Sequence, residues 1–421
     1  MSGIDGWNWD AGERRVVELG VLSSFEQVHE FAVSPDGEKL AVPVVEEPGQ
    51  VRVWQNGELW SEAVERAWSL RFLPDGRLVA LVRVDDSWTV AVDGQRWEDE
   101  FEFAWNLKFS ANGRSLAVQV KRGMKYGLVI DGRDWGAEFI SMRDFALSPD
   151  GKRAAALVQV EQLAEADIFK FAEGVWSVAV DGQPWERRFI NVYSPVFSPD
   201  GQHVAAEVRL DMFEYSIAED GRPWDAVFGT SWAPCYRSNG KGIIAPVRTP
   251  EGWALVENGK PVWQGRYSQM WHQRLAPDGQ RLAAVVSTAY GRWTVAVDDR
   301  PWPRTFSDVV LAPRFSPDGG RVVALARDQG SWLVVVNGQP WPGRFDMAWE
   351  PEFSPDGRHL AAKVERDGKF QVVIDGHPLP RSFDMLWSPR FSPQGDKLLV
   401  RAVEEGVYKR LVLGLEQLAR A

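Results

Sequence analysis

Short runs of apolar residues recur along the chain, and each run is bounded by polar turn residues. WTVAVDGQRW at 88–97 and WLVVVNGQPW at 332–341 are rich in Val and Trp and are apolar at successive positions. Such a run indicates a β-strand that is covered on both faces. No segment of the repeat shows a helical period over a comparable length, so the pattern predicts an all-β protein.

Two kinds of turn separate the expected strands. The first is Ser-Pro-Asp-Gly or a variant of it, in which Pro presets a type I turn and Gly takes a left-handed conformation. The second is Asp-Gly or Asn-Gly, which type I′ hairpins favour because both central residues need a positive φ. The glycines of the first turn are Gly37, Gly76, Gly113, Gly151, Gly201, Gly240, Gly279, Gly319, Gly357 and Gly395. Those of the second are Gly57, Gly94, Gly132, Gly182, Gly221, Gly259, Gly338 and Gly376, and Asp298-Asp299 occupies the same place in one copy.

The first turn recurs ten times, at intervals of 37 to 40 residues with one interval of 50. The second turn lies about halfway between successive copies, so each unit has two hairpins and about four short strands. A four-stranded sheet that is covered on both faces by neighbours of its own kind is a propeller blade. The sequence therefore predicts a β-propeller of about ten four-stranded repeats, forming one domain over residues 1–421.

The two ends of the chain each carry part of a unit. The chain opens with Asp5-Gly6 and Trp9, and GVYKRLVLGLEQ near its end supplies the complementary half. If the first strand completes the last blade, the blades form a single large ring closed by the N-terminal strand. The alternative is two five-bladed propellers, because propellers typically have about 4 to 8 blades. The spacing stays regular at the midpoint and no linker interrupts it, which favours the single ring.

Tryptophan follows the repeat. Eight copies have Trp three residues after the second residue of the second turn, a ninth has it four residues after, and five copies have Trp six residues before it. A third column lies eleven residues after the same position, or twelve in the case of Trp271: Trp68, Trp105, Trp232, Trp271, Trp349 and Trp387. A Trp at the same place in every repeat is expected to pack between blades. Because the third column precedes the strand that usually lies innermost in propellers, its members are also candidate anchors for a partner protein.

A basic column lies five residues before the glycine of the first turn: Arg71, Lys108, Arg274, Arg314 and Arg390. If it faces the central channel, that channel is basic inside an acidic protein and could accept an acidic peptide or a cofactor tail. The alternative is that these side chains lie between blades or pair with the turn aspartates.

Two insertions interrupt the repeat. One adds about twelve residues around AGERRVVELGVLSSFEQ near the amino terminus, and the other is VEQLAEADIFKFAEG at 160–174. Because segments that depart from a regular scaffold often carry function, Ile168, Phe169 and Phe171 are candidate docking residues. The alternative for the second insertion is a merely elongated hairpin.

The charge and the composition of the chain argue against several kinds of partner and site. The net charge of -11, with Lys and Arg scattered, disfavours a nucleic-acid or anionic-membrane partner. No apolar window could span a bilayer and no secretory signal is visible, so we expect a cytoplasmic protein without a membrane span. The single Cys235 excludes an internal disulfide and a multi-cysteine metal or iron-sulfur site. No phosphate-binding loop or nucleophile elbow occurs, and we expect no catalytic residue, cofactor or metal.

The FSPDGRHLAAKV-type unit resembles the TolB-like subgroup of WD-type propeller repeats over nearly the whole chain. The recurring WxVxVDGxPW, together with the extreme tryptophan content, is similar to the tryptophan-rich TmcD family, a component of the Tmc transmembrane redox complex of sulfate-reducing bacteria. The resemblance implies attachment to the cytoplasmic face of a membrane electron-transfer complex. It also implies two partners, an iron-sulfur subunit and a cytochrome b subunit, and no redox centre in this chain.

These observations favour a noncatalytic, cytoplasmic scaffold that acts through protein-protein interaction. The alternative function is that of an enzyme or a small-ligand sensor that uses the central channel.

Overall fold

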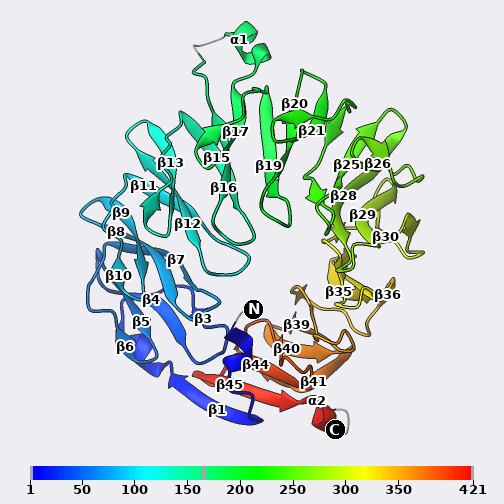
Figure 1. Ribbon diagram of the computed structural model, residues 1–421. Coiled ribbons are helices and arrows are strands. Elements are labelled where there is room, and N and C mark those ends of the chain that lie inside the picture. The colour runs from blue at the N-terminus through cyan, green and yellow to red at the C-terminus, as the bar shows by residue number, and fades with distance from the viewer. Residues whose placement is uncertain (1–2, 164–166, 419–421) are drawn as a thin grey trace. The chain divides into compact units, whose positions relative to one another are not determined.

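The computed structural model describes residues 3–163 and 167–418. In these residues the strands form ten antiparallel sheets of four or five strands, and all but one of the sheets are built only from strands that are close in sequence (Figure 1). The protein is a β-propeller of ten four-stranded blades, which confirms the predicted fold class. In the sheets with five strands, the extra strand arises because the first strand of the blade is divided into two short pieces.

The fifth blade shows the common topology. Its strands are β19 (Asn191–Phe197), β20 (Val204–Arg209), β21 (Tyr215–Glu219) and β22 (Arg222–Pro223), hydrogen-bonded in that order. A Ser-Pro-Asp-Gly turn joins the first strand to the second, and an Asp-Gly turn joins the third to the fourth. The second strand is buried on both faces from Val204 to Val208, as its continuous apolar sequence predicts.

Contacts divide the chain into two compact units, one of residues 1–104 and 316–421 and one of residues 105–315. The strands of the first unit are β1 (Gly12–Glu18), β2 (Gln27–Val28), β3 (Ala32–Val33), β4 (Leu40–Glu47), β5 (Gln50–Gln55), β6 (Glu58–Leu59), β7 (Arg66–Phe72), β8 (Leu78–Val84), β9 (Ser87–Val92), β10 (Gln95–Arg96), β34 (Val322–Asp328), β35 (Ser331–Val336), β36 (Gln339–Pro340), β37 (Met347–Ala348), β38 (Glu352–Phe353), β39 (Leu360–Arg366), β40 (Lys369–Ile374), β41 (His377–Phe383), β42 (Met385–Leu386), β43 (Arg390–Phe391), β44 (Lys397–Glu404) and β45 (Val407–Gly414).

The second unit contains the strands of the fifth blade and the other strands not given for the first unit. Besides β19 to β22, they are β11 (Phe103–Phe109), β12 (Leu116–Arg122), β13 (Lys125–Ile130), β14 (Arg133–Asp134), β15 (Ser141–Leu147), β16 (Ala154–Gln159), β17 (Trp176–Val180), β18 (Gln183–Pro184), β23 (Thr230–Ser231), β24 (Cys235–Tyr236), β25 (Ile243–Thr249), β26 (Gly252–Glu257), β27 (Lys260–Pro261), β28 (Gln269–Leu275), β29 (Leu282–Ala289), β30 (Arg292–Val297), β31 (Arg300–Pro301), β32 (Val309–Val310) and β33 (Arg314–Phe315).

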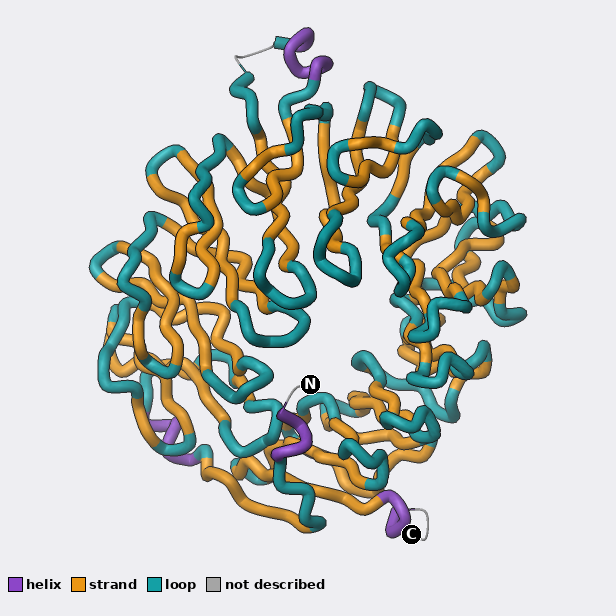
Figure 2. The backbone as a smooth tube through the Cα atoms, viewed as in Figure 1, coloured by secondary structure: helices purple, strands orange, loops and turns teal. Residues whose placement is uncertain are grey.

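We number the blades in chain order. The first is β2 to β6, the second β7 to β10, the third β11 to β14, the fourth β15 to β18, the fifth β19 to β22, the sixth β23 to β27, the seventh β28 to β31, the eighth β32 to β36, the ninth β37 to β41, and the tenth β42 to β45 with β1. Helical segments are short: η1 (Gly3–Gly6), η2 (Gly20–Ser24), α1 (Ile168–Glu173) and α2 (Leu415–Leu418) (Figure 2).

The second turn ties two strands of its blade together. In the fourth blade Asp181 and Gly182 have φ angles of 49° and 81°, as a type I′ turn requires. The Asp181 carboxylate also accepts a hydrogen bond from the Ala154 N–H, at the start of the second strand, over 3.0 Å. The same hydrogen bond recurs in nine blades. Its acceptor is the side-chain oxygen of the first residue of the second turn: Asn56, Asp93, Asp131, Asp181, Asp220, Asn258, Asp298, Asn337 and Asp375. This bond explains why Asp298-Asp299 can replace Asp-Gly, because Asp298 keeps the acceptor.

The first turn is stabilised by its own side chains. In the fourth blade the Ser148 hydroxyl donates to the Asp150 carboxylate over 2.7 Å, and Asp150 accepts the Lys152 N–H over 3.1 Å. The hydrogen bond from Ser148 lowers the pKa of Asp150 below its ordinary value. The carboxylate therefore caps the backbone of its own turn.

The tryptophan columns pack in two different ways. The column three residues after the second turn packs between blades: a Cβ placed on Gly221 would lie 3.1 Å from the Cβ of Trp185 in the preceding blade. Five members of the third column pack on the aromatic residue of the third strand of their own blade. Trp271 and Trp293, for example, have ring centroids 4.7 Å apart. Packing between blades is confirmed for the first column, and also for Trp176 and Trp253 of the second column, which belong to core clusters that continue into the next blade.

The N-terminal strand completes the last blade, as predicted. β1 pairs with β45 in an antiparallel ladder that runs from Gly12 opposite Val412 to Glu18 opposite Val407. The residues that close the blade differ from those expected, because Asp5-Gly6 lies in η1 and forms no hairpin. The residues flanking Asp5-Gly6 include no run of apolar residues that could form strands, whereas the first insertion supplies GERRVVE. That insertion is therefore the closing strand.

Candidate functional site

A β-bulge interrupts the first strand of several blades directly after the third tryptophan column. In β7 Trp68 lies opposite Leu81 and Arg71 lies opposite Val79, so three steps along β7 match two steps along β8. Residues two apart on one strand point to the same face. The bulge therefore directs the side chains of Trp68 and Arg71 to the same face, whereas a regular strand would direct them to opposite faces.

The same distortion recurs. Ser69, Asn106, Ser194 and His272 each follow the aromatic residue of this column and have φ angles of 51° to 56°. A left-handed conformation is unfavourable for residues other than glycine, and such residues are enriched at functional sites. In the seventh blade Trp271 and Arg274 have the same relationship as Trp68 and Arg71. The third tryptophan column and the basic column are thus two halves of one feature, although the sequence pattern presents them as separate.

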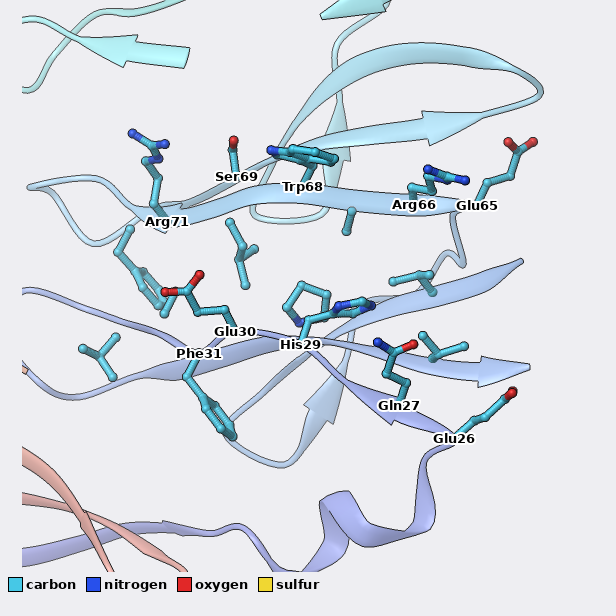
Figure 3. A pocket seen from close by; sticks show the side chains of 18 of the residues that line it. Glu26, Gln27, His29, Glu30, Phe31, Glu65, Arg66, Trp68, Ser69 and Arg71 are labelled. Atoms are coloured by element: carbon cyan, nitrogen blue, oxygen red, sulfur yellow. The ribbon is translucent and has the colours of Figure 1, made fainter. Parts of the chain in front are cut away.

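A groove of about 1060 Å³ lies at the bulge of the second blade. Figure 3 shows Trp68, Ser69 and Arg71 along β7, with His29 and Glu30 on the facing segment of the first blade. The groove brings together three of the residues singled out from the sequence: Trp68, Arg71 and Trp387. Its other charged lining residues, which the sequence did not single out, are Glu26, Glu30, Glu65 and Arg66.

Trp68 differs from the rest of its column. Its side chain is 63% exposed, the largest exposure in the column. In the other five copies the indole packs on the third strand of its own blade, with ring centroids 4.7 to 5.9 Å apart: Trp105 on Tyr126, Trp232 on Trp253, Trp271 on Trp293, Trp349 on Phe370, and Trp387 on Tyr408. Within the described ranges Trp68 has no such ring contact. Its indole is available to a partner.

In the ninth blade a lysine side chain covers the face of the corresponding indole. The Lys363 ammonium lies 3.9 Å from the ring centroid of Trp349 and 4.6 Å from that of Phe370. The backbone N–H of Trp349 donates to the Lys363 carbonyl oxygen, so the two residues face each other across the ladder. In the second blade the residue opposite Trp68 is Leu81, which is buried and carries no charge. The indole of Trp68 therefore lacks the cation that covers Trp349.

Three acidic side chains line the same groove as the open indole. Glu26 and Glu30 line the groove and are exposed. Glu65 is held in place, since it lies 3.5 Å from the Arg83 guanidinium and accepts the Asp86 N–H over 3.3 Å. An aromatic face beside carboxylates is a suitable environment for a cationic group. Arg66 and Arg71 also line the groove and add positive charge to it.

A smaller cavity of about 210 Å³ lies between the sixth and seventh blades. It brings together Trp232, Trp271 and Arg274, with His272 and Cys235 also in its lining. Burial lowers the pKa of His272, with a further contribution from Arg274, and burial raises the pKa of Cys235. In this cavity the tryptophan and the arginine of one strand are three residues apart, as they are in the groove. The cavity has a much smaller volume than the groove.

Two members of the basic column pair with a carboxylate of a neighbouring blade. The Lys108 ammonium lies 2.5 Å from the Asp144 carboxylate, and the Arg390 guanidinium lies 2.6 Å from that of Glu352. Burial alone would raise the pKa of Asp144, but hydrogen bonds from Lys108, Asn106 and the Phe145 N–H lower it. Arg71, Arg274 and Arg314 are exposed. That the column faces a common channel stays a prediction.

The second insertion is more than an elongated hairpin. It carries α1, whose first turn is capped by Asp167, which accepts the Lys170 N–H over 2.9 Å. Of the candidate docking residues, Ile168 and Phe169 are exposed and Phe171 is half-buried. Residues 164–166 of this insertion lie outside the described residues.

Metal-binding clusters and membrane-spanning helices are not found in the described part of the chain. Among residues 3–163 and 167–418, no group of three or more His, Cys, Asp or Glu side chains is arranged to hold a metal ion. In the same residues no helix is long and apolar enough to cross a membrane.

No protein-family model matches the chain, and no curated protein is significantly similar to it in sequence. Three solved structures match the chain at low sequence identity and with TM-scores below 0.5. A eukaryotic initiation factor is 16% identical, with 86% of this chain and 89% of that chain covered and a TM-score of 0.47. The Myceliophteria thermophila Cps50 (Swd1) β-propeller domain is 13% identical, with 65% and 98% covered and a TM-score of 0.31. The Dos1 propeller is 12% identical, with 96% and 94% covered and a TM-score of 0.35.

Proposed function

We propose that this protein is a noncatalytic scaffold that binds a partner protein in the groove beside Trp68. The observation that carries the proposal is the exposed indole of Trp68, which among the described residues is the one member of its column without an aromatic packing partner in its own blade. An accessible tryptophan surrounded by charged side chains has the composition of an interaction hot spot with a polar rim.

The groove is suited to a basic side chain of the partner. A Lys or Arg placed over Trp68 would repeat the contact that Lys363 makes with Trp349, and Glu26 and Glu30 would supply the opposite charge. The net charge of -11 would attract a basic segment at long range. We therefore propose an extended segment of the partner, with at least one basic residue, as the ligand of the groove.

The resemblance to the tryptophan-rich component of the redox complex suggests the identity of the partners. On that basis we propose a cytoplasmic accessory protein of a membrane electron-transfer complex, bound to the iron-sulfur subunit and the cytochrome b subunit. Its role would be to hold these subunits in a fixed arrangement rather than to carry electrons itself.

Capture from native membranes tests the proposal. The tagged 421-residue chain is expected to retain both redox subunits, and Trp68→Ala is expected to retain at least about tenfold less of them. Trp232→Ala is the matched control, because Trp232 belongs to the same column, is also exposed and stacks on Trp253. Equal capture by wild type and Trp68→Ala would show that the groove is not the binding site. Capture of no redox subunit by wild type would refute the proposed partners.

A second measurement tests the ligand of the groove directly. Overlapping peptides from the captured subunits are titrated against the wild-type chain and against Trp68→Ala. The binding peptide is expected to contain Lys or Arg, and its replacement by Gln is expected to weaken binding about as much as Trp68→Ala does. Unchanged binding of the Gln peptide would contradict the proposed cation contact.

A further inference from the structure

The cavity between the sixth and seventh blades is lined by two indoles and one guanidinium. Trp232 comes from the sixth blade, and Trp271 and Arg274 come from the seventh. All three residues belong to the same compact unit, residues 105–315. The volume of the cavity is about 210 Å³, whereas sites for drug-sized ligands have about 300 to 1,000 Å³. A ligand of this cavity is therefore a small molecule with a single ring or less.

The β-bulge of β28 directs Trp271 and Arg274 to one face of the seventh blade. Trp271 lies opposite Val285 and Arg274 lies opposite Ala283, so three steps along β28 match two steps along β29. The residue at the bulge, His272, also lines the cavity and has a φ angle of 56°. Such a conformation is unfavourable for histidine, and it is concentrated at ligand-binding and active sites. The seventh blade thus presents an indole and a guanidinium to the same cavity.

The sixth blade supplies a second indole but no second cation. The Trp232 N–H donates to the Pro246 carbonyl oxygen, and Cys235, three residues later, lies opposite Ile244. Cys235 occupies the repeat position of Arg274, because each is five residues before the glycine of its first turn. Burial raises the pKa of Cys235, so its thiol is uncharged at neutral pH. The small cysteine therefore leaves space beside Arg274 that a second arginine would fill.

Each indole is covered by an aromatic ring of its own blade. Trp232 stacks on Trp253 with ring planes 4° apart, and Trp271 lies 4.7 Å from Trp293 between ring centroids. Across the described ranges of the chain, Trp232 and Trp271 make no ring contact with each other. Trp232 is 44% exposed. Indole surface thus remains open to the cavity, and a flat aromatic ring is the group that packs best on it.

Arg274 lacks a carboxylate partner. In the described part of the chain its guanidinium forms no ion pair and donates only to the Gln273 carbonyl oxygen, over 3.2 Å. Lys108 and Arg390 of the same column, in contrast, each pair with a carboxylate. No Asp or Glu is among the described residues that line the cavity. Burial lowers the pKa of His272, and Arg274 lowers it further, so the imidazole is mainly neutral at pH 7. A ligand carboxylate would supply the missing partner of Arg274.

We propose that this cavity binds a small aromatic carboxylic acid. The ring of the acid packs on the indoles of Trp232 and Trp271, and its carboxylate accepts hydrogen bonds from the Arg274 guanidinium. The groove beside Trp68 has the opposite chemistry, since three carboxylates line it. The chain then has two separate sites, one for a basic segment of a partner protein and one for a small acid.

Cys235 provides a local measurement, because it lines the cavity and is the only cysteine of the chain. Its modification by N-ethylmaleimide is followed by mass spectrometry on the purified 421-residue protein, with benzoate as the probe. Calorimetric titration of benzoate is expected to give a Kd of about 10 µM to 1 mM. At about ten times that Kd, benzoate is expected to slow the modification about tenfold. Absence of binding, or binding that leaves Cys235 unprotected, would overturn the inference.

A neutral analogue and two variants test the role of Arg274. Benzamide has the same ring without the charge and is expected to bind at least about tenfold more weakly than benzoate. Arg274→Gln is expected to weaken benzoate binding by a similar factor and to unfold at the wild-type temperature, because Arg274 is exposed. Arg292→Gln is the matched control, since Arg292 is exposed in the same blade and does not line the cavity. Equal affinities for benzoate and benzamide would overturn the inference.

Two further ligands test the role of the indoles. Cyclohexanecarboxylate keeps the charge but has no flat ring, and it is expected to bind about two- to tenfold more weakly than benzoate. Protection of Cys235 by sulfate as strong as that by benzoate would show a site for inorganic anions and overturn the inference.

Tryptophan variants separate this cavity from the groove. Trp232→Ala is expected to bind benzoate at least about threefold more weakly while it retains the captured redox subunits. Trp68→Ala is expected to bind benzoate as wild type does, so failure of the groove proposal leaves this one intact. Unchanged benzoate affinity in Trp232→Ala would contradict the proposed packing of the ring.

Discussion

The Arg401 guanidinium donates a hydrogen bond to the Ser34 carbonyl oxygen over 3.1 Å, although the two residues are 367 positions apart in the chain. The same guanidinium donates to the Ser388 carbonyl oxygen over 2.6 Å. Arg401 is almost fully buried, and burial lowers its pKa to about 10, so it remains charged at neutral pH. This cation joins the tenth blade to the first turn of the first blade.

Replacing Arg401 by Met is expected to lower the free energy of unfolding by about 2 to 4 kcal/mol, because buried carbonyl oxygens lose their donor. Urea unfolding followed by tryptophan fluorescence measures the change. Arg292→Met is the control, since Arg292 is exposed and is expected to change stability by less than about 0.5 kcal/mol. Equal stabilities of the two variants would mean that the contact between these blades contributes nothing.

Trp68 and Trp349 occupy the same repeat position but are expected to respond differently to truncation. Trp349 packs on Phe370 and is covered by Lys363, so Trp349→Ala is expected to lower the free energy of unfolding by about 2 to 3 kcal/mol. Trp68→Ala is expected to lower it by less than about 1 kcal/mol, because most of the side chain is already in water. Denaturant midpoints of the two purified variants check this. A large loss of stability in Trp68→Ala would mean that its indole is a packing residue.

Glu207 is expected to make stability depend on pH between about 4.5 and 8. The residue is buried in β20, opposite Tyr193 and Ile217, and burial raises its pKa to about 8. In this pH range the folded chain holds a proton that the unfolded chain has released, so the free energy of unfolding falls as pH rises, by up to about 1.4 kcal/mol per pH unit. The slope ends above pH 8, where both states are ionised.

Glu207→Gln is the matched variant, because it keeps the shape and cannot ionise. Its unfolding free energy is expected to lack this slope and to exceed that of wild type at pH 8. Urea unfolding at pH 5, 6, 7 and 8 provides the comparison. Parallel curves for the two proteins would show that Glu207 is ionised in the folded chain.

The turn aspartates are expected to contribute to unfolding in acid. Hydrogen bonds from the serine of the same turn lower the pKa of Asp150, Asp200, Asp318 and Asp356 below the ordinary value of 3.8. Their stabilising contribution is present above that value and is lost as pH falls below it, when the folded chain must take up these protons.

Asn112 shows how to test this contribution. It accepts the Ser110 hydroxyl over 2.6 Å in the place of the aspartate, so asparagine is compatible with the turn. A chain with all four aspartates changed to Asn is expected to fold at pH 7 and to lose stability less steeply below pH 4. An unchanged acid slope, measured by circular dichroism during acid titration, would assign acid unfolding to other carboxylates.

The fold could be predicted because each blade repeats two turns whose chemistry is local. Asp181-Gly182 adopts its positive φ angles without help from distant residues, and Ser148 and Asp150 bond within their own turn. The closing strand was harder to place. Gly12–Glu18 has no turn beside it to fix its register, and its partner lies at the other end of the chain.

The candidate site could be predicted only in part, because it depends on a break in the regular pattern. Trp68 and Arg71 are three residues apart, and regular alternation would place them on opposite faces. Only the bulge at Ser69 brings them together, and nothing in a serine specifies a left-handed conformation. Glu30 reaches the groove from another blade, and its position follows from packing rather than from any repeat.

The pairing of β1 with β45 has a consequence for folding during synthesis on the ribosome. Gly12–Glu18 leaves the ribosome well before Val407–Gly414, its partner in the ladder. At about 5 to 20 residues per second, this segment waits roughly 20 to 80 seconds for its partner while the intervening blades are made. A permuted gene that begins between two complete blades would remove that delay, and the newly made chain would spend less time with an unsatisfied edge open to aggregation.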